Sequence, residues 1–181
     1  MKLIIGLTGE PASGKGTVAA YCREKFGASS YRFSDPLFET LRLLDVAASR
    51  ENLVALSVSL RRDFGETVLA QALSRKVRDD NHELIVIDGI RRLGDIETLR
   101  TIPGFHLVSI TAEVKTRYER QLQRGEKAGE TTMTFEQFLE LENAPTERSI
   151  REVAALAEAA ITNNGTLPDL YQTIDAFIKQ L

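Results

Sequence analysis

The chain has 181 residues, of which 43% are hydrophobic and 27% are charged, and its formal net charge at pH 7 is -3. This length and composition fit one folded domain over residues 1–181 and exclude a disordered chain as the default. The acidic balance argues against a general nucleic-acid binder, because affinity for a duplex depends on clustered positive charge that neutralises phosphates.

The first apolar segment and the single cysteine indicate the environment of the chain. Residues 3–5 are apolar but are followed by Gly6, Thr8 and Gly9, so the run is too short for a signal-peptide core or a membrane span. Cys22 has no second cysteine with which to form an internal disulfide. We therefore expect a cytoplasmic protein that makes no membrane contact.

Apolar runs alternate with helical patterns along the chain. The runs predict strands at residues 2–7, 30–33, 84–87, 105–111 and 160–162. Helices are predicted at residues 15–26, 113–124, 134–142, 146–158 and 168–181, with more helical sequence from 34 to about 80 and from about 93. This alternation predicts an α/β fold in three layers, in which a five-stranded parallel sheet lies between helices and binds ligands at the carboxyl ends of its strands.

A glycine-rich segment lies between the first predicted strand and the first predicted helix. Residues 9–17 read Gly-Glu-Pro-Ala-Ser-Gly-Lys-Gly-Thr and contain the G-x4-G-K core of a Walker A phosphate loop. Its glycines let successive backbone N–H groups converge on phosphate oxygens, and Lys15 adds a positive charge beside the outer phosphates. The predicted nucleotide contacts are Gly9, Pro11, Ala12, Ser13, Gly14, Lys15, Gly16 and Thr17.

The residue after Lys15 departs from the usual pattern. Gly16 stands where a Walker A loop has Ser or Thr, so the usual hydroxyl ligand for Mg2+ is missing at that position. The order Gly-Lys-Gly-Thr resembles adenylate kinases and related nucleoside monophosphate kinases. This resemblance implies that Mg2+ is held largely through water and that Thr17 faces the inner phosphate, with direct ligation of the metal by Thr17 as the second possibility.

A carboxylate and two arginines follow the third predicted strand. Asp88 stands at the end of the apolar run, a Walker B-like position from which it can hold Mg2+ through water. Residues 88–92, Asp-Gly-Ile-Arg-Arg, resemble the Asp-Gly-x-x-Arg signature of nucleoside monophosphate kinases, whose arginine grips the acceptor or the transferring phosphate. Arg92 matches that spacing, whereas the Asp-Gly-Ile-Arg of an archaeal adenylate-kinase-like group favours Arg91, so the sequence leaves both open. A hairpin turn at Asp-Gly is disfavoured because no second strand follows.

A second acidic motif follows the second predicted strand. Residues 34–37, Ser-Asp-Pro-Leu, resemble the acceptor-site entry of deoxynucleoside monophosphate kinases, which implies that Asp35 acts as an acceptor-side base or a sugar contact. Ser34 and Asp35 fit a simple helix start equally well. Adenylate kinases have an arginine near position 38 that this chain lacks. The candidate replacements are Arg42, Arg61 and Arg62.

Three arginines recur at helical spacing near the predicted loop at residues 125–132. Arg117, Arg120 and Arg124 follow one another at i, i+3 and i+7 and therefore share one stripe of a helix. This arrangement resembles a short kinase lid at about residues 117–133, which implies that Arg117 contacts the nucleotide and that Arg120 and Arg124 stabilise the transferring phosphoryl group. The alternative is a solvated helix face with an ion pair between Glu113 and Arg117.

A polar turn follows the last predicted strand. Residues 161–166, Ile-Thr-Asn-Asn-Gly-Thr, resemble the x-Asn-x-Gly turn of dephospho-coenzyme A kinases, which implies that Asn164 and Gly165 hold the adenine. An ordinary Asn-Gly turn would have the same sequence.

Together these motifs resemble the P-loop nucleotide kinases over most of the chain. The resemblance implies a P-loop NTPase fold of the nucleotide kinase type, with acceptor-binding helices at about residues 35–80. It also implies that the protein uses ATP and Mg2+ to transfer the γ-phosphoryl group to a nucleoside or deoxynucleoside monophosphate. The catalytic candidates are Lys15, Asp88, Arg91, Arg92, Arg120 and Arg124. Two alternatives stay open, a dephospho-coenzyme A kinase-like enzyme and a regulatory module that binds or hydrolyses ATP without a phosphoryl acceptor.

Overall fold

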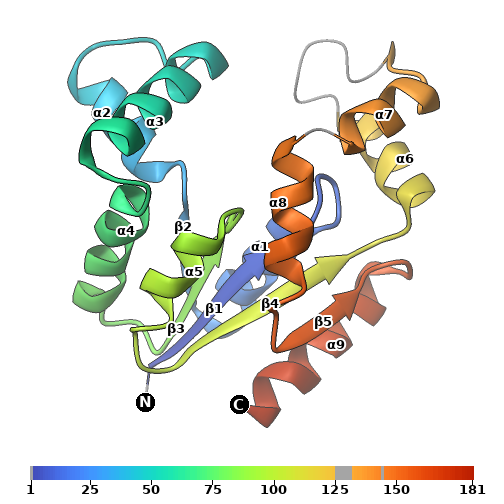
Figure 1. Ribbon diagram of the computed structural model, residues 1–181. Helices are drawn as coiled ribbons and strands as arrows, with labels where there is room; N and C mark the ends of the chain where they lie inside the picture. The colour runs from blue at the N-terminus through green and yellow to red at the C-terminus, as the bar shows by residue number, and fades with distance from the viewer. Residues whose placement is uncertain (1, 125–131, 144) are drawn as a thin grey trace.

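A computed structural model describes residues 2–124, 132–143 and 145–181. Its described strands form one parallel sheet in the order β2-β3-β1-β4-β5, which confirms the predicted α/β fold (Figure 1). The strands are β1 (Leu3–Thr8), β2 (Ser29–Arg32), β3 (Leu84–Asp88), β4 (Phe105–Thr111) and β5 (Ala159–Thr162).

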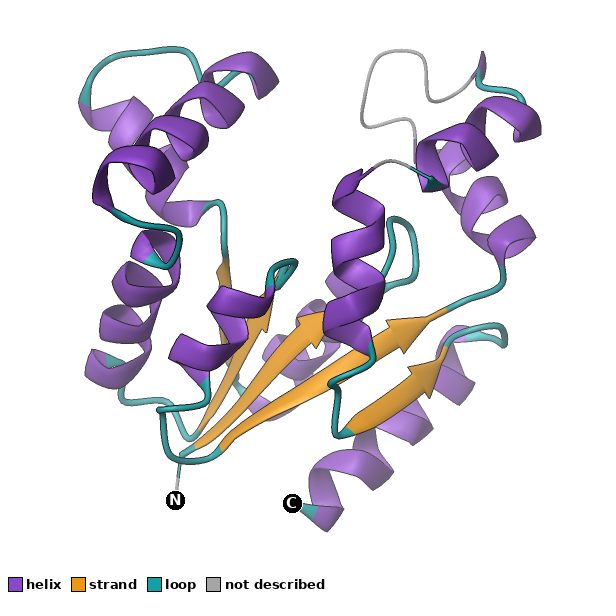
Figure 2. Ribbon diagram, viewed as in Figure 1, coloured by secondary structure: helices purple, strands orange, loops and turns teal. Residues whose placement is uncertain are grey.

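Helices connect the strands and pack on both faces of the sheet (Figure 2). They are α1 (Lys15–Phe26), α2 (Asp35–Leu43), α3 (Arg50–Phe64), α4 (Val68–Asp79), α5 (Leu93–Leu99), α6 (Val114–Arg124), α7 (Phe135–Glu142), α8 (Pro145–Ala154) and α9 (Leu167–Gln180). No helix in the described part of the chain is both long enough and apolar enough to cross a bilayer.

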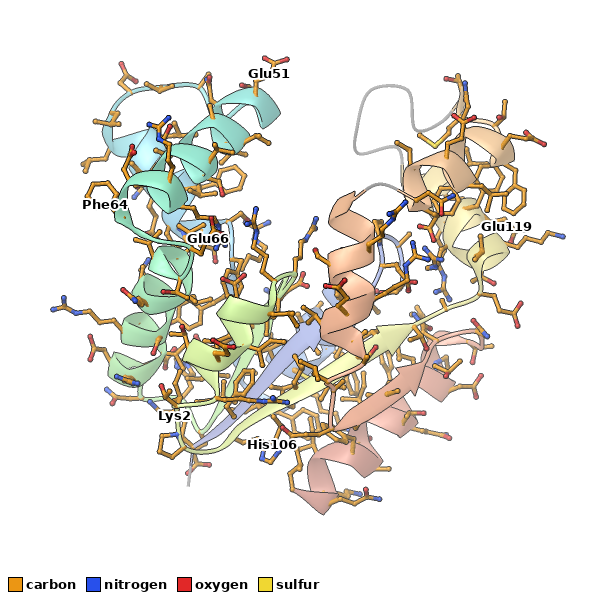
Figure 3. The ribbon with its side chains drawn as sticks, in the orientation of Figure 1. Lys2, Glu51, Phe64, Glu66, His106 and Glu119 are labelled. Carbon is orange, nitrogen blue, oxygen red and sulfur yellow. The ribbon has the colours of Figure 1, made fainter. Side chains whose placement is uncertain are left out.

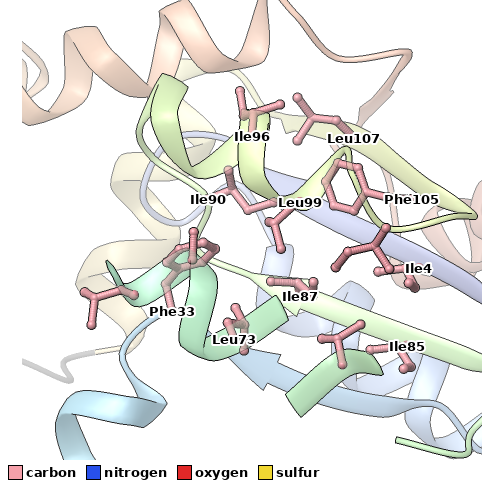
Figure 4. Packing of buried hydrophobic residues seen from close by; sticks show 14 of the residues in the cluster. Ile4, Phe33, Leu73, Ile85, Ile87, Ile90, Ile96, Leu99, Phe105 and Leu107 are labelled. Atoms are coloured by element: carbon pink, nitrogen blue, oxygen red, sulfur yellow. The ribbon is translucent and has the colours of Figure 1, made fainter. Parts of the chain in front are cut away.

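The buried side chains of the strands divide between two apolar clusters. In β1 and β3, Ile4 and Ile85 join a cluster with α4, α5 and α8, whereas Ile5 and Val86 join one with α1 and α9. Neighbouring residues of a strand point to opposite faces of its sheet, so a run of consecutive apolar residues supplies both clusters. Figure 4 shows the first cluster, with Leu73 of α4 beside Ile87 of β3.

The helix before β5 ends earlier than the predicted residue 158. It ends at Ala154, and the next residues form turns that bring the chain to the edge of the sheet. There the N–H of Glu158 donates to the carbonyl oxygen of Leu107 at 2.9 Å. The pairing of β5 with β4 therefore sets the end of the helix, although the local sequence would continue it.

The carboxyl ends of the strands face two helical arms (Figure 1). Helices α2 and α3 form one arm, and α6 and α7 form the other. Lys2 and His106 lie at the opposite end of the sheet, near the amino ends of the strands (Figure 3). Of the predicted lid loop at 125–132, only Thr132 lies within the described residues. The phosphate loop and the carboxyl ends of β2 and β3 lie at the end of the sheet that faces the two arms.

Candidate functional site

The phosphate loop lies between β1 and α1, as its sequence predicts. Strand β1 is flanked by β3 and β4, so the loop leaves the sheet at its centre. Residues Gly9, Ala12 and Gly14 have positive φ angles of 139°, 59° and 106°. Backbone of this kind can turn successive N–H groups toward one side and form an anion site, and here it leads directly into the amino end of α1.

Two glycines of the loop are required by close neighbours as well as by their φ angles. A Cβ atom on Gly9 would lie 2.1 Å from the carbonyl oxygen of Ile110, and one on Gly14 would lie 2.2 Å from Nδ2 of Asn163. Both values are far below a van der Waals contact. Gly16, in contrast, has no heavy atom within 4 Å of the place where its Cβ would be.

Lys15 lies against the phosphate loop. Its Nζ donates to the carbonyl oxygens of Gly9 at 2.8 Å and of Glu10 at 3.0 Å. These bonds hold the ammonium group at the mouth of the loop, beside the place where phosphates would bind. Thr17 follows in the first turn of α1 and is half-buried.

Asp88 ends β3 next to the phosphate loop, in register with Leu7 of β1 and Arg32 of β2. Burial raises the pKa of its carboxyl group, and the positive charges of Lys15 and Arg91 lower it to a smaller extent. The side chain is therefore a carboxylate held among cations in a poorly solvated place, an arrangement typical of functional sites.

Several buried polar atoms near the phosphate loop have no hydrogen-bond partner. Four buried side-chain N or O atoms in the described residues have no hydrogen-bond partner, and three of them are Ser13 Oγ, Asp88 Oδ1 and Arg120 Nη1. Asn163 connects Ser13 to Arg120 by hydrogen bonds, and Asp88 is next to Lys15. Buried polar groups are nearly always satisfied in folded proteins, so these atoms fit a ligand that offers both acceptor oxygens and a cation.

Arg91 and Arg92, the two arginines after β3, interact with different acidic residues. Arg91 lies near enough to Asp88 for its charge to lower the pKa of that carboxyl group. Arg92 donates from Nη1 to Oε2 of Glu66 at 2.8 Å, and Glu66, which Figure 3 labels, lies between α3 and α4. Of the two candidates, Arg91 is therefore the one whose charge acts on Asp88.

Asp35 lines a pocket of about 400 Å³ next to the phosphate loop. Its carboxylate accepts from the backbone N–H of Arg32 at 2.6 Å and from Arg32 Nε at 3.2 Å. Ser34 precedes α2 but makes no side-chain capping bond, so neither residue acts as an ordinary cap for this helix. The residues that line the pocket are Gly16, Ala19, Ala20, Arg23, Ser30, Arg32, Asp35 and Asp88.

The arginines considered as replacements on the acceptor side do not line this pocket. Arg42 is exposed on α2. Arg62 is exposed and donates from Nε to Asp63 at 2.7 Å. Arg61 is buried and pairs with Asp95 of α5 at 3.3 Å. Arg32, which the sequence did not single out, lies in the pocket and stacks over the ring of Phe38 at 5.7 Å.

The arginines of α6 have different environments. Arg117 is 2% exposed, and its two terminal nitrogens donate to the carboxylate oxygens of Glu142 at 2.7 and 2.6 Å. This buried ion pair joins α6 to α7 and replaces the alternative of a solvated helix face with a pair between Arg117 and Glu113, whereas the nucleotide contact of Arg117 stays a prediction. Arg120 faces the phosphate loop through Asn163, at 3.4 Å. Arg124 is the last residue of α6, and its side chain lies outside the described residues.

In the turn after β5, the neighbouring asparagines have different partners. Asn164 Oδ1 accepts from the backbone N–H of Glu113 at 2.8 Å, which joins this turn to the start of α6. Gly165 lies close to the Asp169 carboxylate, which closes a capping box with Thr166 at the start of α9. Asn163 is buried and donates from Nδ2 to the carbonyl oxygen of Ser13 at 2.8 Å. From the sequence alone, Asn163 was not identified as a site residue. Its position as the first residue of the Asn-x-Gly turn was the feature that could have indicated it.

The two glycines of the loop make a matched test. We expect Gly14→Ala to lower the free energy of unfolding by roughly 1–3 kcal/mol, because it combines a strained φ with a clash against Asn163. Gly16→Ala should change it by less than about 1 kcal/mol, because the added methyl meets open space in a helical turn. Urea unfolding of both variants measures the difference, and equal effects would contradict the described loop.

Asp88→Asn should stabilise the protein near neutral pH. Because burial raises the folded-state pKa of Asp88 above its ordinary value of 3.8, stability falls as the pH rises from 3.8 through the raised pKa, and above it the penalty is complete. The variant should therefore unfold at higher urea than wild type at pH 7.5, and this gain should disappear below pH 3.8. Glu97→Gln, which changes an exposed carboxylate on α5, is the control and should unfold at pH 7.5 at nearly the same urea concentration as wild type. A destabilised Asp88→Asn variant at pH 7.5 would contradict the assignment.

Comparisons with known proteins agree with this geometry. A family model described as an AAA domain matches residues 8–138, which include the phosphate loop and Asp88. A relative described as a UPF0200 protein from Sulfurisphaera tokodaii is 30% identical over 178 residues, covering 98% of this chain and 97% of the relative.

Solved structures of small-molecule kinases share the fold. Shikimate kinase from Acinetobacter baumannii, in complex with shikimate, matches with a TM-score of 0.62 and 20% identity, over 99% of this chain and 94% of that one. A gluconokinase from Sinorhizobium meliloti matches with a TM-score of 0.59 and 13% identity, over 99% and 92% of the two chains. The resemblance to P-loop kinases is thereby confirmed at the level of the fold. The chain therefore belongs to the AAA domain family, is related to the UPF0200 proteins and shares its fold with small-molecule kinases.

Proposed function

We propose that the chain is an ATP- and Mg2+-dependent phosphotransferase that moves the γ-phosphoryl group of ATP to a nucleoside or deoxynucleoside monophosphate. The observation that carries this proposal is the group of unpartnered buried atoms, Ser13 Oγ, Asp88 Oδ1 and Arg120 Nη1, around a phosphate loop. The proposal includes a cytoplasmic location and one kinase domain over residues 1–181.

On the donor side, the backbone of residues 9–17 would wrap the phosphates of the nucleotide. Lys15 would exchange its bonds to the carbonyl oxygens of Gly9 and Glu10 for bonds to the outer phosphates. Asp88 and Thr17 fit a hydrated Mg2+ ion, which when bound would neutralise charge on those phosphates. The free Oδ1 of Asp88 supports this role, because a bound water could donate to it.

During transfer, the arginines would stabilise negative charge and hold the reacting groups in line. Arg91 approaches from the end of β3, and Arg120 approaches from α6 on the other side of the phosphate loop. Arg124 is proposed to complete this set from the lid. Phosphoryl transfer requires mainly such positioning and charge stabilisation, together with exclusion of water by a closing lid.

The pocket beside the phosphate loop is the proposed acceptor site. Asp35 and Asp88 line it together with Arg23 and Arg32, so it offers carboxylates for hydroxyl groups and guanidinium groups for an anionic group. Arg32 is held by Asp35 and by the ring of Phe38, and we propose that it takes the role of the arginine that adenylate kinases have near position 38. Ser34 would contribute from the same turn.

Acceptor-dependent release of ADP tests the proposal. Purified protein with Mg-ATP should release ADP faster when a nucleoside or deoxynucleoside monophosphate is added than with ATP alone, and Lys15→Ala should abolish this turnover. Dephospho-coenzyme A, shikimate and gluconate are the comparison acceptors. Stimulation by one of these alone would redirect the proposal to another small-molecule kinase. Slow hydrolysis that no acceptor stimulates would replace it with a regulatory module.

Arg91 and Arg92 supply a matched pair of variants. Arg91→Ala should lower kcat by about 100-fold or more, because a charge beside the transferring group is lost. Arg92→Ala should change kcat by less than about threefold, because Arg92 makes an exposed ion pair with Glu66. Steady-state kinetics on the preferred acceptor measures both, and a larger loss in Arg92→Ala would reverse the assignment.

A further inference from the structure

Asn163 occupies a buried position between the phosphate loop and α6. It is 5% exposed and directly follows β5. Its backbone N–H donates to the carbonyl oxygen of Thr111 at 2.7 Å, so the end of β4 fixes the position of its main chain. The side chain therefore projects from a rigid base toward the loop.

The side-chain amide of Asn163 joins two parts of the candidate site. Its Nδ2 donates to the carbonyl oxygen of Ser13 at 2.8 Å, and its Oδ1 accepts from Arg120 Nη2 at 3.4 Å. A primary amide is suited to this task, because it carries a donor and an acceptor on one planar group without a net charge. An aspartate here would offer the loop carbonyl no donor and would present a negative charge to Arg120.

The contact to Arg120 is long, and it leaves the guanidinium group with unused capacity. The 3.4 Å separation makes this a long and weak N–H···O bond, and Nη1 of the same group is buried without a partner. An arginine held by a neutral group keeps its full charge for an incoming anion, whereas one paired with a carboxylate does not.

We propose that Asn163 is a positioning residue that holds Arg120 over the phosphate loop, so that Arg120 recognises the terminal phosphate of the nucleotide. This inference rests on the proposed nucleotide binding and extends it by identifying the contact that distinguishes a triphosphate from a diphosphate. Asn163 itself acts through its two neighbours, because its Nδ2 bonds to Ser13 and its Oδ1 to Arg120.

Nucleotide binding tests the inference without requiring the acceptor. Calorimetric titration of the full chain with Mg2+ and either a non-hydrolysable ATP analogue or ADP gives the ratio of the two Kd values. Wild type should prefer the triphosphate. Asn163→Asp should reduce this preference by about tenfold or more, because the new carboxylate captures Arg120. Thr162→Ala, an exposed neighbour at the end of β5, is the control and should keep the wild-type ratio.

A double-mutant cycle separates positioning from a general structural effect. Arg120→Ala should remove the triphosphate preference, and adding Asn163→Asp to it should reduce that preference no further. Asn163→Ser serves if the aspartate variant does not fold, as judged by circular dichroism. It should also weaken the preference, because the side chain no longer reaches both partners.

Three results would overturn the inference. The first is that Asn163→Asp and Arg120→Ala reduce the triphosphate preference additively in the double mutant. The others are a wild-type ratio of Kd values in both Asn163 variants and equal Kd values for the two nucleotides in wild type. A failure of the proposed kinase activity can be distinguished from these results. In that case no acceptor would stimulate the release of ADP, whereas the ratio of the two Kd values would still test the roles of Asn163 and Arg120.

Discussion

The confinement of the phosphate loop is the constraint on which the rest of the site depends. The loop turns through positive φ angles between the end of β4, which crowds Gly9, and the amide of Asn163, which crowds Gly14. These contacts leave no room for a Cβ atom at either glycine, so they restrict the path of the loop at both positions. Rigid placement of donors of this kind is what makes anion binding and charge stabilisation effective.

Polar groups that remain unsatisfied around this loop carry an energetic cost. The buried carboxylate of Asp88 has a raised pKa, and Ser13 and Arg120 each keep one buried atom without a partner. Isolated buried groups of this type cost about 1–3 kcal/mol each. The two apolar clusters on either side of the sheet supply the compensating stability, because consecutive buried residues of each strand contribute to both.

Two buried ion pairs fix the helices that surround the site. Arg61 of α3 pairs with Asp95 of α5, and Arg117 of α6 pairs with Glu142 of α7. Removal of one member of such a pair leaves an uncompensated buried charge, which costs about 3–5 kcal/mol. Each pair therefore holds one arm in a defined arrangement, and both of these arginines serve the structure although their spacing in the sequence also suited a substrate or nucleotide contact.

The sequence by itself determined the features that are encoded locally. These are the apolar runs of the strands, the phosphate loop between strand and helix, and Asp88 at the end of a strand, because each depends on neighbouring residues and on backbone preferences. Only the tertiary structure decided that the charge of Arg91 acts on Asp88, that Arg117 is buried against Glu142, and that Asn163 supports a loop 150 residues earlier in the chain. The physical reason is that the direction and partner of a long side chain follow from the packing of distant segments, on which local sequence carries little information.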